Sequence, residues 1–320
     1  LKDRDIIGIT ESLLARAQGN YLEITEIAQE TRTLFPDHFV VLFPILSRNR
    51  FSHILKGLAM SGRNITVMLS YPSDEVGNHL MDPDAMYAAN LNPHKDVLSR
   101  QEFRRLFGHE FKHPFTGLDY IDLYMDLAVD NNIEVVLAND PLSALEFSKD
   151  VLVATIHNRN HMKNLLLANG GNRIIALDEM ATKPGRSGGY NPEYGLLGSN
   201  LAGKSRLKLF PRDAQQFCDG IQKILFEKTG KTVEVLVYGD GAFKDPVGKI
   251  WELADPVVSP GFTNGLRGTP NEIKMKYIAD NELAGLSQEE AQRQLKQMIT
   301  QKGNNLLGQN ASLGTTPRQL

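Results

Sequence analysis

The sequence contains a single cysteine, Cys218, so the chain can form no internal disulfide. A chain without a disulfide framework fits the reducing cytoplasm most simply. The longest apolar run, Phe39–Leu46, contains Pro44 and is far shorter than the about 20 residues that a membrane-spanning helix needs. Basic residues are not in excess, with 35 Lys and Arg against 38 Asp and Glu, so general nucleic-acid binding is not expected either.

The 320 residues amount to about two domains at roughly 150 residues each, or to one large α/β unit. Hydrophobic residues make up 41% and charged residues 23%, which is typical of globular proteins rather than of disordered chains, collagen or coiled coils. The chain starts at Leu1 rather than Met, and we expect it to be part of a longer protein. Cys218 lies among apolar residues at helical spacing, which predicts a buried small side chain rather than a nucleophile.

Short apolar, β-branched runs alternate with longer runs that have helical periodicity. Several of the short runs are apolar on both faces, as expected of strands buried inside a layered sheet. This alternation predicts an α/β or mixed α+β fold, with a layered sheet and flanking helices. The expected strands are 5–10, 39–46, 64–70, 133–139, 150–156, 173–177 and 232–238, and the clearest helical stripes lie at 24–34, 118–128, 162–169 and 213–228.

Local signals mark where some helices begin. Asp140 before Pro141 predicts a helix cap, and Ser287 with Glu290 predicts a capping box at the start of the last helix. After Asp255 the chain loses its strand signals, so we expect an α/β domain over 1–255 and a mainly helical C-terminal part over 256–320. The irregular stretches 70–99 and 182–203 are long enough to be functional loops.

Acidic residues follow several of the expected strands, at the end where ligands bind in open α/β sheets. Clustered carboxylates repel one another unless a cation lies between them, and oxygen ligands suit Mg²⁺ or Mn²⁺. We interpret Asp74 and Asp240 as functional because both lie in non-helical segments that contain glycine. Asp140 is interpreted as a cap, whereas for Asp178 and Glu179 a functional and a structural role remain open.

The segment YGDGAFKDP (238–246) places Asp240 between Gly239 and Gly241, which lets the backbone approach a ligand closely. Lys244 lies within reach of the same loop. The structural alternative is a glycine turn with a solvated Lys–Asp pair.

Gly198–Ser205 reads GSNLAGKS and satisfies the phosphate-loop pattern, with Lys204 and Ser205 at its end. That pattern binds phosphate only between a buried strand and a helix. Neither flank has the required character here, so we do not expect a true phosphate loop. His109 and His113 are spaced as a helical pair, but Pro114 follows directly and no third zinc ligand can be named.

Several segments resemble the coenzyme F420-0:L-glutamate ligases (F420 is the name of a deazaflavin coenzyme). The opening DIIGITESLLARAQGN (5–20) is similar to the first strand, turn and helix of that family, with Gln18 where an acid is usual. SDEVGN (73–78) resembles the family's acidic loop with Val76-Gly77 in place of Ser. Asp240-Gly241-Ala242-Phe243 resembles a second loop, with Gly241 in place of Thr and Lys244 in the basic position. HPFTGLDY (113–120) adds to the likeness.

The resemblance implies a homodimeric ligase that uses GTP and a divalent metal, Mg²⁺ or Mn²⁺, to activate a carboxylate as an acyl phosphate. The amine of L-glutamate then attacks, which gives a γ-glutamyl amide on a small acidic or phosphorylated acceptor. The implied metal ligands are Asp74, Glu75 and Asp240. The implied catalytic residues are Asp240, Lys244 and Arg16, and the implied cofactor-binding residues are Ser12, Asn78, Gly239, Gly241, Lys204 and Arg159.

Two alternatives remain. The chain could keep the fold and bind nucleotide or metal without ligase chemistry, since Thr is missing after Asp240. It could instead be a phosphate-loop nucleotidase that uses Lys204 and Ser205.

Overall fold

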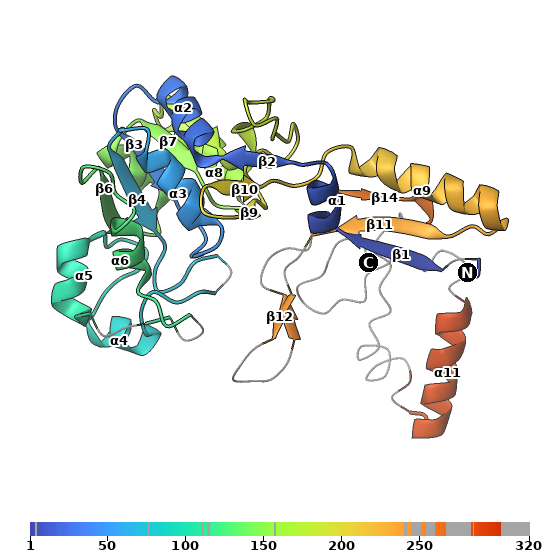
Figure 1. The fold of residues 1–320 in the computed structure, drawn as a ribbon. Helices are drawn as coiled ribbons and strands as arrows, with labels where there is room; N and C mark the ends of the chain where they lie inside the picture. The colour runs from blue at the N-terminus through green and yellow to red at the C-terminus, as the bar shows by residue number, and fades with distance from the viewer. Residues whose placement is uncertain are drawn as a thin grey trace. The chain divides into compact units, whose positions relative to one another are not determined.

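The computed structural model describes residues 1–3, 5–75, 77–109, 112–113, 116–156, 158–239, 242–244, 251–253, 260–266, 283 and 285–301. The chain forms two compact units (Figure 1). The larger unit is Ala15–Arg212, and the smaller unit combines Leu1–Leu14 with Asp213–Leu320. The expected boundary at Asp255 falls on a residue outside the described ranges, so the division into 1–255 and 256–320 stays a prediction.

The larger unit is built on a six-stranded sheet with the strand order β5-β6-β4-β3-β7-β8. Five of its strands are parallel, and only β5 runs antiparallel to its neighbour β6. The strands are β3 (Phe39–Leu42), β4 (Ile65–Leu69), β5 (Leu98–Ser99), β6 (Ile133–Leu137), β7 (Asp150–Val153) and β8 (Arg173–Ala176).

The order of the parallel strands reverses beside β3. From β3 the chain adds β4 and β6 on one side, and then returns to add β7 and β8 on the other. The connections after β3 and β7 therefore leave in opposite directions, and by the general rule for such sheets the ligand crevice is expected at the carboxyl ends of these two strands. In sheets of this order the crevice is the usual place for a ligand.

Helices cover both faces of this sheet, so its strands are buried on both sides. Phe39 and Val41 pack toward one cluster, whereas Val40 and Leu42 pack toward the other, as alternation along a strand requires. The first cluster includes residues of α2 (Ile24–Leu34), α3 (Phe51–Ala59), α5 (Arg100–Phe107) and α6 (Tyr120–Met125). The second includes residues of α7 (Ala144–Phe147) and α8 (Arg159–Ala168).

Short elements complete the larger unit. A small antiparallel sheet has the order β2-β10-β9 and is formed by β2 (Tyr21–Glu23), β9 (Asn200–Leu201) and β10 (Arg206–Lys208). The remaining elements are α4 (Pro83–Ala88), η1 (Pro141–Ser143) and η2 (Leu177–Glu179). Asp140 accepts a hydrogen bond from the Leu142 backbone at the start of η1, which confirms its interpretation as a cap.

The smaller unit has its own sheet, in which β11 (Glu234–Tyr238) pairs with β1 (Ile6–Thr10) and with β14 (Gly261–Phe262). Helix α9 (Ala214–Thr229) packs on it through Cys218, which is buried, as the sequence predicts. Burial raises the pKa of the Cys218 thiol to about 11, so the thiol is not activated as a nucleophile. The unit also contains α1 (Glu11–Ala17, which continues into the larger unit), β12 (Ala242–Lys244), β13 (Trp251–Leu253), η3 (Asn264–Leu266) and α11 (Gln288–Gln301).

The mixed α/β architecture expected from the sequence is confirmed, and each expected strand is present. The segment after Asp255, which we expected to be mainly helical, also contains a short strand, β14, before helix α11. Within the described residues, none of the helices is long and apolar enough to cross a membrane.

Candidate functional site

Asp74 lies in the loop that follows β4 and is a buried carboxylate, with 8% of its surface exposed. Its Oδ2 accepts hydrogen bonds from the Leu46 backbone N–H at 2.8 Å and from the Asn78 side-chain amide at 2.8 Å. Its Oδ1 accepts the Asn78 backbone N–H at 2.8 Å. One carboxylate thus joins the loop after β3 to the loop after β4, so Asp74 determines the shape of this edge of the sheet.

His113 extends this group of polar side chains. Its Nε2 lies 3.2 Å from Asn78 Oδ1, and its Nδ1 accepts the Thr116 backbone N–H at 3.4 Å. Because Nδ1 accepts, we assign the ring proton to Nε2, which then donates to Asn78. A directed chain of hydrogen bonds therefore runs from His113 through Asn78 to Asp74.

Burial lowers the pKa of His113, the nearby Asp74 charge opposes this shift, and His79 adds to it. A histidine whose pKa is lower in the folded than in the unfolded protein stabilises the fold at pH values above its unfolded pKa. This stability is lost as the pH falls through the folded pKa. We therefore expect the free energy of unfolding to decrease below about pH 6.5. Urea unfolding of wild type and His113→Gln between about pH 7.5 and 5 measures this effect. If the free energy of unfolding depends on pH equally in the two proteins, His113 does not have the lowered pKa.

In the loop after β7, both backbone groups of Ile156 are hydrogen-bonded to charged side chains. Glu75 Oε1 accepts the Ile156 backbone N–H at 2.6 Å, and Arg159 Nη1 donates to the Ile156 carbonyl at 2.7 Å. Arg159 Nε also donates to Asp178 Oδ2 at 2.7 Å. The structure therefore connects Asp74, Glu75, Asn78 and Arg159 at one sheet edge, as the sequence predicts for residues that follow parallel strands.

A second group of predicted residues lies in the smaller unit. Strands β1 and β11 are parallel, and Thr10 pairs with Tyr238 at their carboxyl ends. Ser12 and Gly239, which follow these residues, therefore start from the same edge of one sheet. The two acidic segments 73–78 and 238–246 therefore follow strands of different sheets. Asp74 follows β4 of the larger unit, and Gly239 follows β11 of the smaller unit.

The other predicted residues are placed as follows. Arg16 is exposed on α1, and Lys204 is exposed in the turn between β9 and β10. Strand β10 follows Ser205 where a phosphate loop needs a helix, so the GSNLAGKS segment lacks phosphate-loop geometry. Lys244 belongs to β12, and Asp240 and Gly241 lie outside the described residues.

No group of three or more His, Cys, Asp or Glu side chains in the described ranges is arranged to hold a metal ion. Asp74 and Glu75 are adjacent, but the oxygens described above already accept backbone N–H groups. These two residues alone do not fit a divalent ion, and the third predicted ligand, Asp240, lies outside the described residues.

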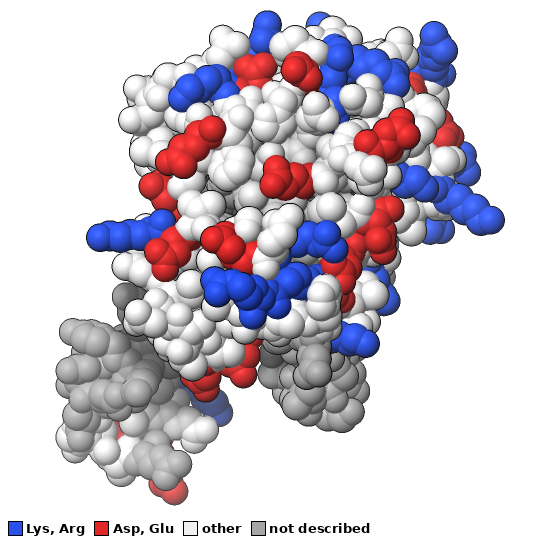
Figure 2. All heavy atoms as spheres, turned by 90° about the vertical axis from the view of Figure 1, so that its left-hand side faces the viewer, with Lys and Arg blue, Asp and Glu red and all other residues white. Residues whose placement is uncertain are grey.

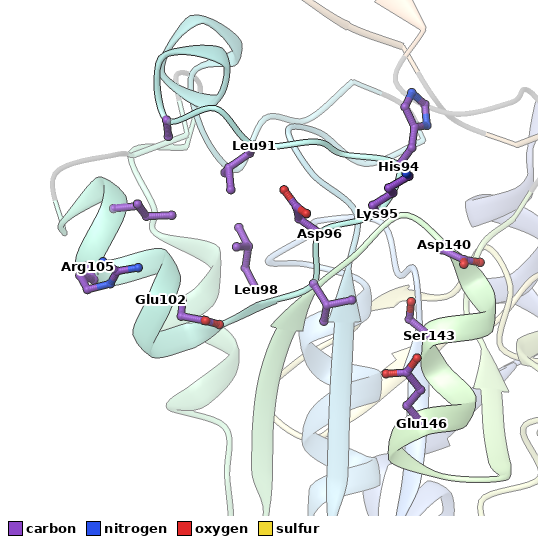
Figure 3. Close-up of a pocket in the computed structure, with 13 residues that line it drawn as sticks. Leu91, His94, Lys95, Asp96, Leu98, Glu102, Arg105, Asp140, Ser143 and Glu146 are labelled. Atoms are coloured by element: carbon purple, nitrogen blue, oxygen red, sulfur yellow. The ribbon is translucent and has the colours of Figure 1, made fainter.

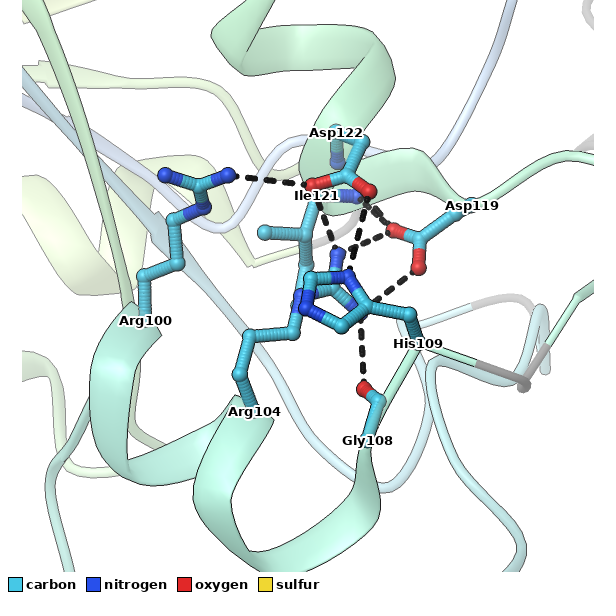
Figure 4. Close-up of polar contacts among 7 residues, drawn as sticks. All are labelled: Arg100, Arg104, Gly108, His109, Asp119, Ile121 and Asp122. Carbon is cyan, nitrogen blue, oxygen red and sulfur yellow. Dashed lines mark hydrogen bonds and ion pairs between the residues drawn. The ribbon is translucent and has the colours of Figure 1, made fainter.

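A network of charges lies between α5 and α6 of the same unit (Figure 4). Arg104 donates to Asp119 Oδ2 at 2.7 Å and to Asp119 Oδ1 at 2.9 Å, and it pairs with Asp122 Oδ1 at 2.8 Å. Burial raises the pKa of Asp122, but Arg104 and Arg100 outweigh burial and hold the pKa below its usual value. Asp119 also caps α6 by accepting two backbone N–H groups. The network therefore has a structural role.

A groove of about 710 Å³ lies between α5 and the η1–α7 segment. Figure 3 shows Glu102 and Arg105 on one wall and Asp140, Ser143 and Glu146 on the other. The face drawn in Figure 2 carries acidic and basic side chains interspersed. The groove combines both charges, and its lining comes from the loop before β5, α5 and the η1–α7 segment rather than from the loops after β3 and β7, so it is a weaker candidate site.

A doubly covered parallel sheet with polar side chains joined at its carboxyl edge is the architecture of α/β proteins that bind small ligands at that edge. The chain belongs to the F420-0:gamma-glutamyl ligase family, whose model matches residues 1–318. Membership indicates a ligase of coenzyme F420 biosynthesis. No curated protein matches the chain, and no solved structure matches it.

Several contacts that shape this edge could not be found from the sequence. The Ser47 backbone N–H donates to the Tyr124 hydroxyl at 3.0 Å across a separation of 77 residues. For His113 the sequence suggests half of a helical pair with His109, or more simply a surface or capping histidine, and neither interpretation includes its contact with Asn78. No local pattern signals either contact, because each depends on how α6 and the loop before it pack on the sheet.

Proposed function

We propose that the protein is a GTP- and divalent-metal-dependent acid–amino-acid ligase that forms a γ-glutamyl amide on a small acidic acceptor. The observation that carries this proposal is the match of the ligase family over residues 1–318. The polar side chains that converge beside β3 support it, since phosphoryl and acyl transfer depend mainly on positioning and charge neutralisation.

In the proposed reaction, the acceptor carboxylate attacks the γ-phosphorus of GTP, which yields an acyl phosphate and GDP. The nitrogen of L-glutamate then attacks the acyl carbon, phosphate leaves, and the nitrogen loses a proton. Arg159 lies at the crevice and suits a carboxylate or phosphate, because a guanidinium binds such groups through paired N–H donors. Asn78 lies in the loop after β4 and can orient a polar ligand group.

The other predicted residues complete the proposal. Asp240, Lys244 and Arg16 are proposed as catalytic, Lys204 as a cation for an anionic ligand, and Ser12, Gly239 and Gly241 as nucleotide-binding. A bound Mg²⁺ or Mn²⁺ would neutralise phosphate charge, with Asp240 as the ligand on which its site depends. We also propose that the ligase acts as a homodimer.

Calorimetric titration of the full chain with GTP and with Mn²⁺ tests this proposal. We expect wild type to bind both, and Asp240→Asn to weaken Mn²⁺-dependent GTP binding by about tenfold or more. Lys204→Ala tests the alternative: a phosphate-loop nucleotidase would lose nucleotide binding in that variant and be merely weakened by Asp240→Asn, whereas we expect the opposite pattern. Wild type that binds neither ligand would overturn the proposal, and binding without turnover would favour a nucleotide-binding protein without ligase activity.

A further inference from the structure

Arg159 and Asp178 form an ion pair where β7 and β8 end, next to the crevice. Arg159 is the first residue of α8, and Asp178 belongs to η2, directly after β8. Their side chains are 26% and 17% exposed, so the pair is partly accessible from solvent. Arg159 also contacts the loop after β7 through the Ile156 carbonyl, which fixes its position relative to the crevice.

The pair leaves one carboxylate oxygen without a partner. Asp178 Oδ2 accepts from Arg159, but Oδ1 is buried and accepts no hydrogen bond from the described residues. An unpaired buried acceptor is unfavourable, and such atoms often mark a place where another molecule supplies the donor. Of the three guanidinium nitrogens of Arg159, Nε and Nη1 make the hydrogen bonds given above.

We propose that Arg159 and Asp178 bind the amino-acid substrate, with the guanidinium on a substrate carboxylate and the Asp178 carboxylate on the substrate's α-ammonium group. This inference rests on the proposed ligase function and assigns its amino-acid site. A zwitterion can insert into an existing ion pair and leave every charge paired, because its carboxylate replaces Asp178 and its ammonium replaces Arg159. A simple anion would leave Asp178 without a cation.

The neighbouring ion pair shows what a structural pair looks like here. Lys163 lies one turn further along α8 and pairs with both oxygens of Glu179. Glu179 Oε2 also accepts the Ala176 backbone N–H at 2.8 Å, so its oxygens have partners. The two pairs join the same helix to the same turn, but only Asp178 has an orphaned oxygen. Glu179 is therefore a matched control.

Calorimetric titration with L-glutamate and with glutarate, which lacks the ammonium group, tests the assignment. We expect Asp178→Asn to weaken L-glutamate binding by about tenfold or more without weakening glutarate binding, because glutarate offers Asp178 no cation. Arg159→Gln is expected to weaken both ligands, and Glu179→Gln neither. Thermal unfolding of each variant shows whether it is folded.

Three results would overturn the assignment: wild type that binds no L-glutamate, an unchanged L-glutamate affinity in Asp178→Asn, or equal losses in Asp178→Asn and Glu179→Gln. A separate GTP titration of the same proteins distinguishes the two proposals. Normal GTP binding with one of these results removes the amino-acid site alone. The expected glutamate pattern without GTP binding removes the nucleotide-dependent ligase and leaves the site.

Discussion

Replacing Asp74 by alanine is expected to lower the free energy of unfolding by about 3 kcal/mol. The carboxylate accepts the Leu46 and Asn78 backbone N–H groups and the Asn78 side-chain amide in a buried position. Alanine leaves these donors unpaired and separates the loops after β3 and β4. Urea unfolding followed by circular dichroism measures the loss.

Asp84→Ala is the matched control for this change, because Asp84 is exposed in the same 70–99 region. Its backbone N–H donates to Asp82 Oδ1, and alanine keeps this hydrogen bond. Its unfolding free energy should stay within about 0.5 kcal/mol of wild type. A loss of similar size in both variants would show that Asp74 does not hold the two loops together.

Arg104→Ala should be similarly damaging, with an expected loss of about 3 kcal/mol. The Arg104 side chain is 9% exposed, and its removal leaves Asp119 and Asp122 without the cation that they share. Since the capping residue of α6 is one of these carboxylates, we also expect α6 to become less protected in hydrogen exchange.

Arg105→Ala tests whether the effect belongs to the pairing rather than to the loss of any arginine from α5. Arg105 is the next residue along the helix and is exposed at the groove. Its replacement should change the free energy of unfolding by about 0.5 kcal/mol or less. A normal unfolding curve for Arg104→Ala would show that the ion pairs contribute little.

The main strands could be predicted from the sequence because their residues are apolar on both faces. Phe39–Leu42 and Ile65–Leu69 are fully buried, and such runs have few alternatives to an interior strand. Strands β2 and β10 could not be predicted, because each has three residues, some of them polar and exposed or half-buried, such as Arg206. Segments this short give no periodic signal. The Asp140 cap was found because its partner is two residues away.

The candidate site could be predicted only in part. Asp74, Glu75 and Arg159 each follow a parallel strand, and the carboxyl ends of parallel strands lie at one edge of the sheet. Their shared edge could be predicted because this rule depends on strand direction alone. It could not show that Asp74 would be used to hold Leu46, which lies 28 residues away. It also could not distribute the strands between two sheets, since sheet order depends on packing that the sequence pattern does not contain.

Mass spectrometry of coenzyme F420-0 incubated with the protein, GTP, Mn²⁺ and L-glutamate tests the central claim most directly. We expect a product heavier by one glutamate residue, formed only when all components are present, with one GDP and one phosphate released per amide bond. If GTP and L-glutamate both bind but the acceptor's mass stays unchanged and no GDP forms, the chain is not the ligase proposed here.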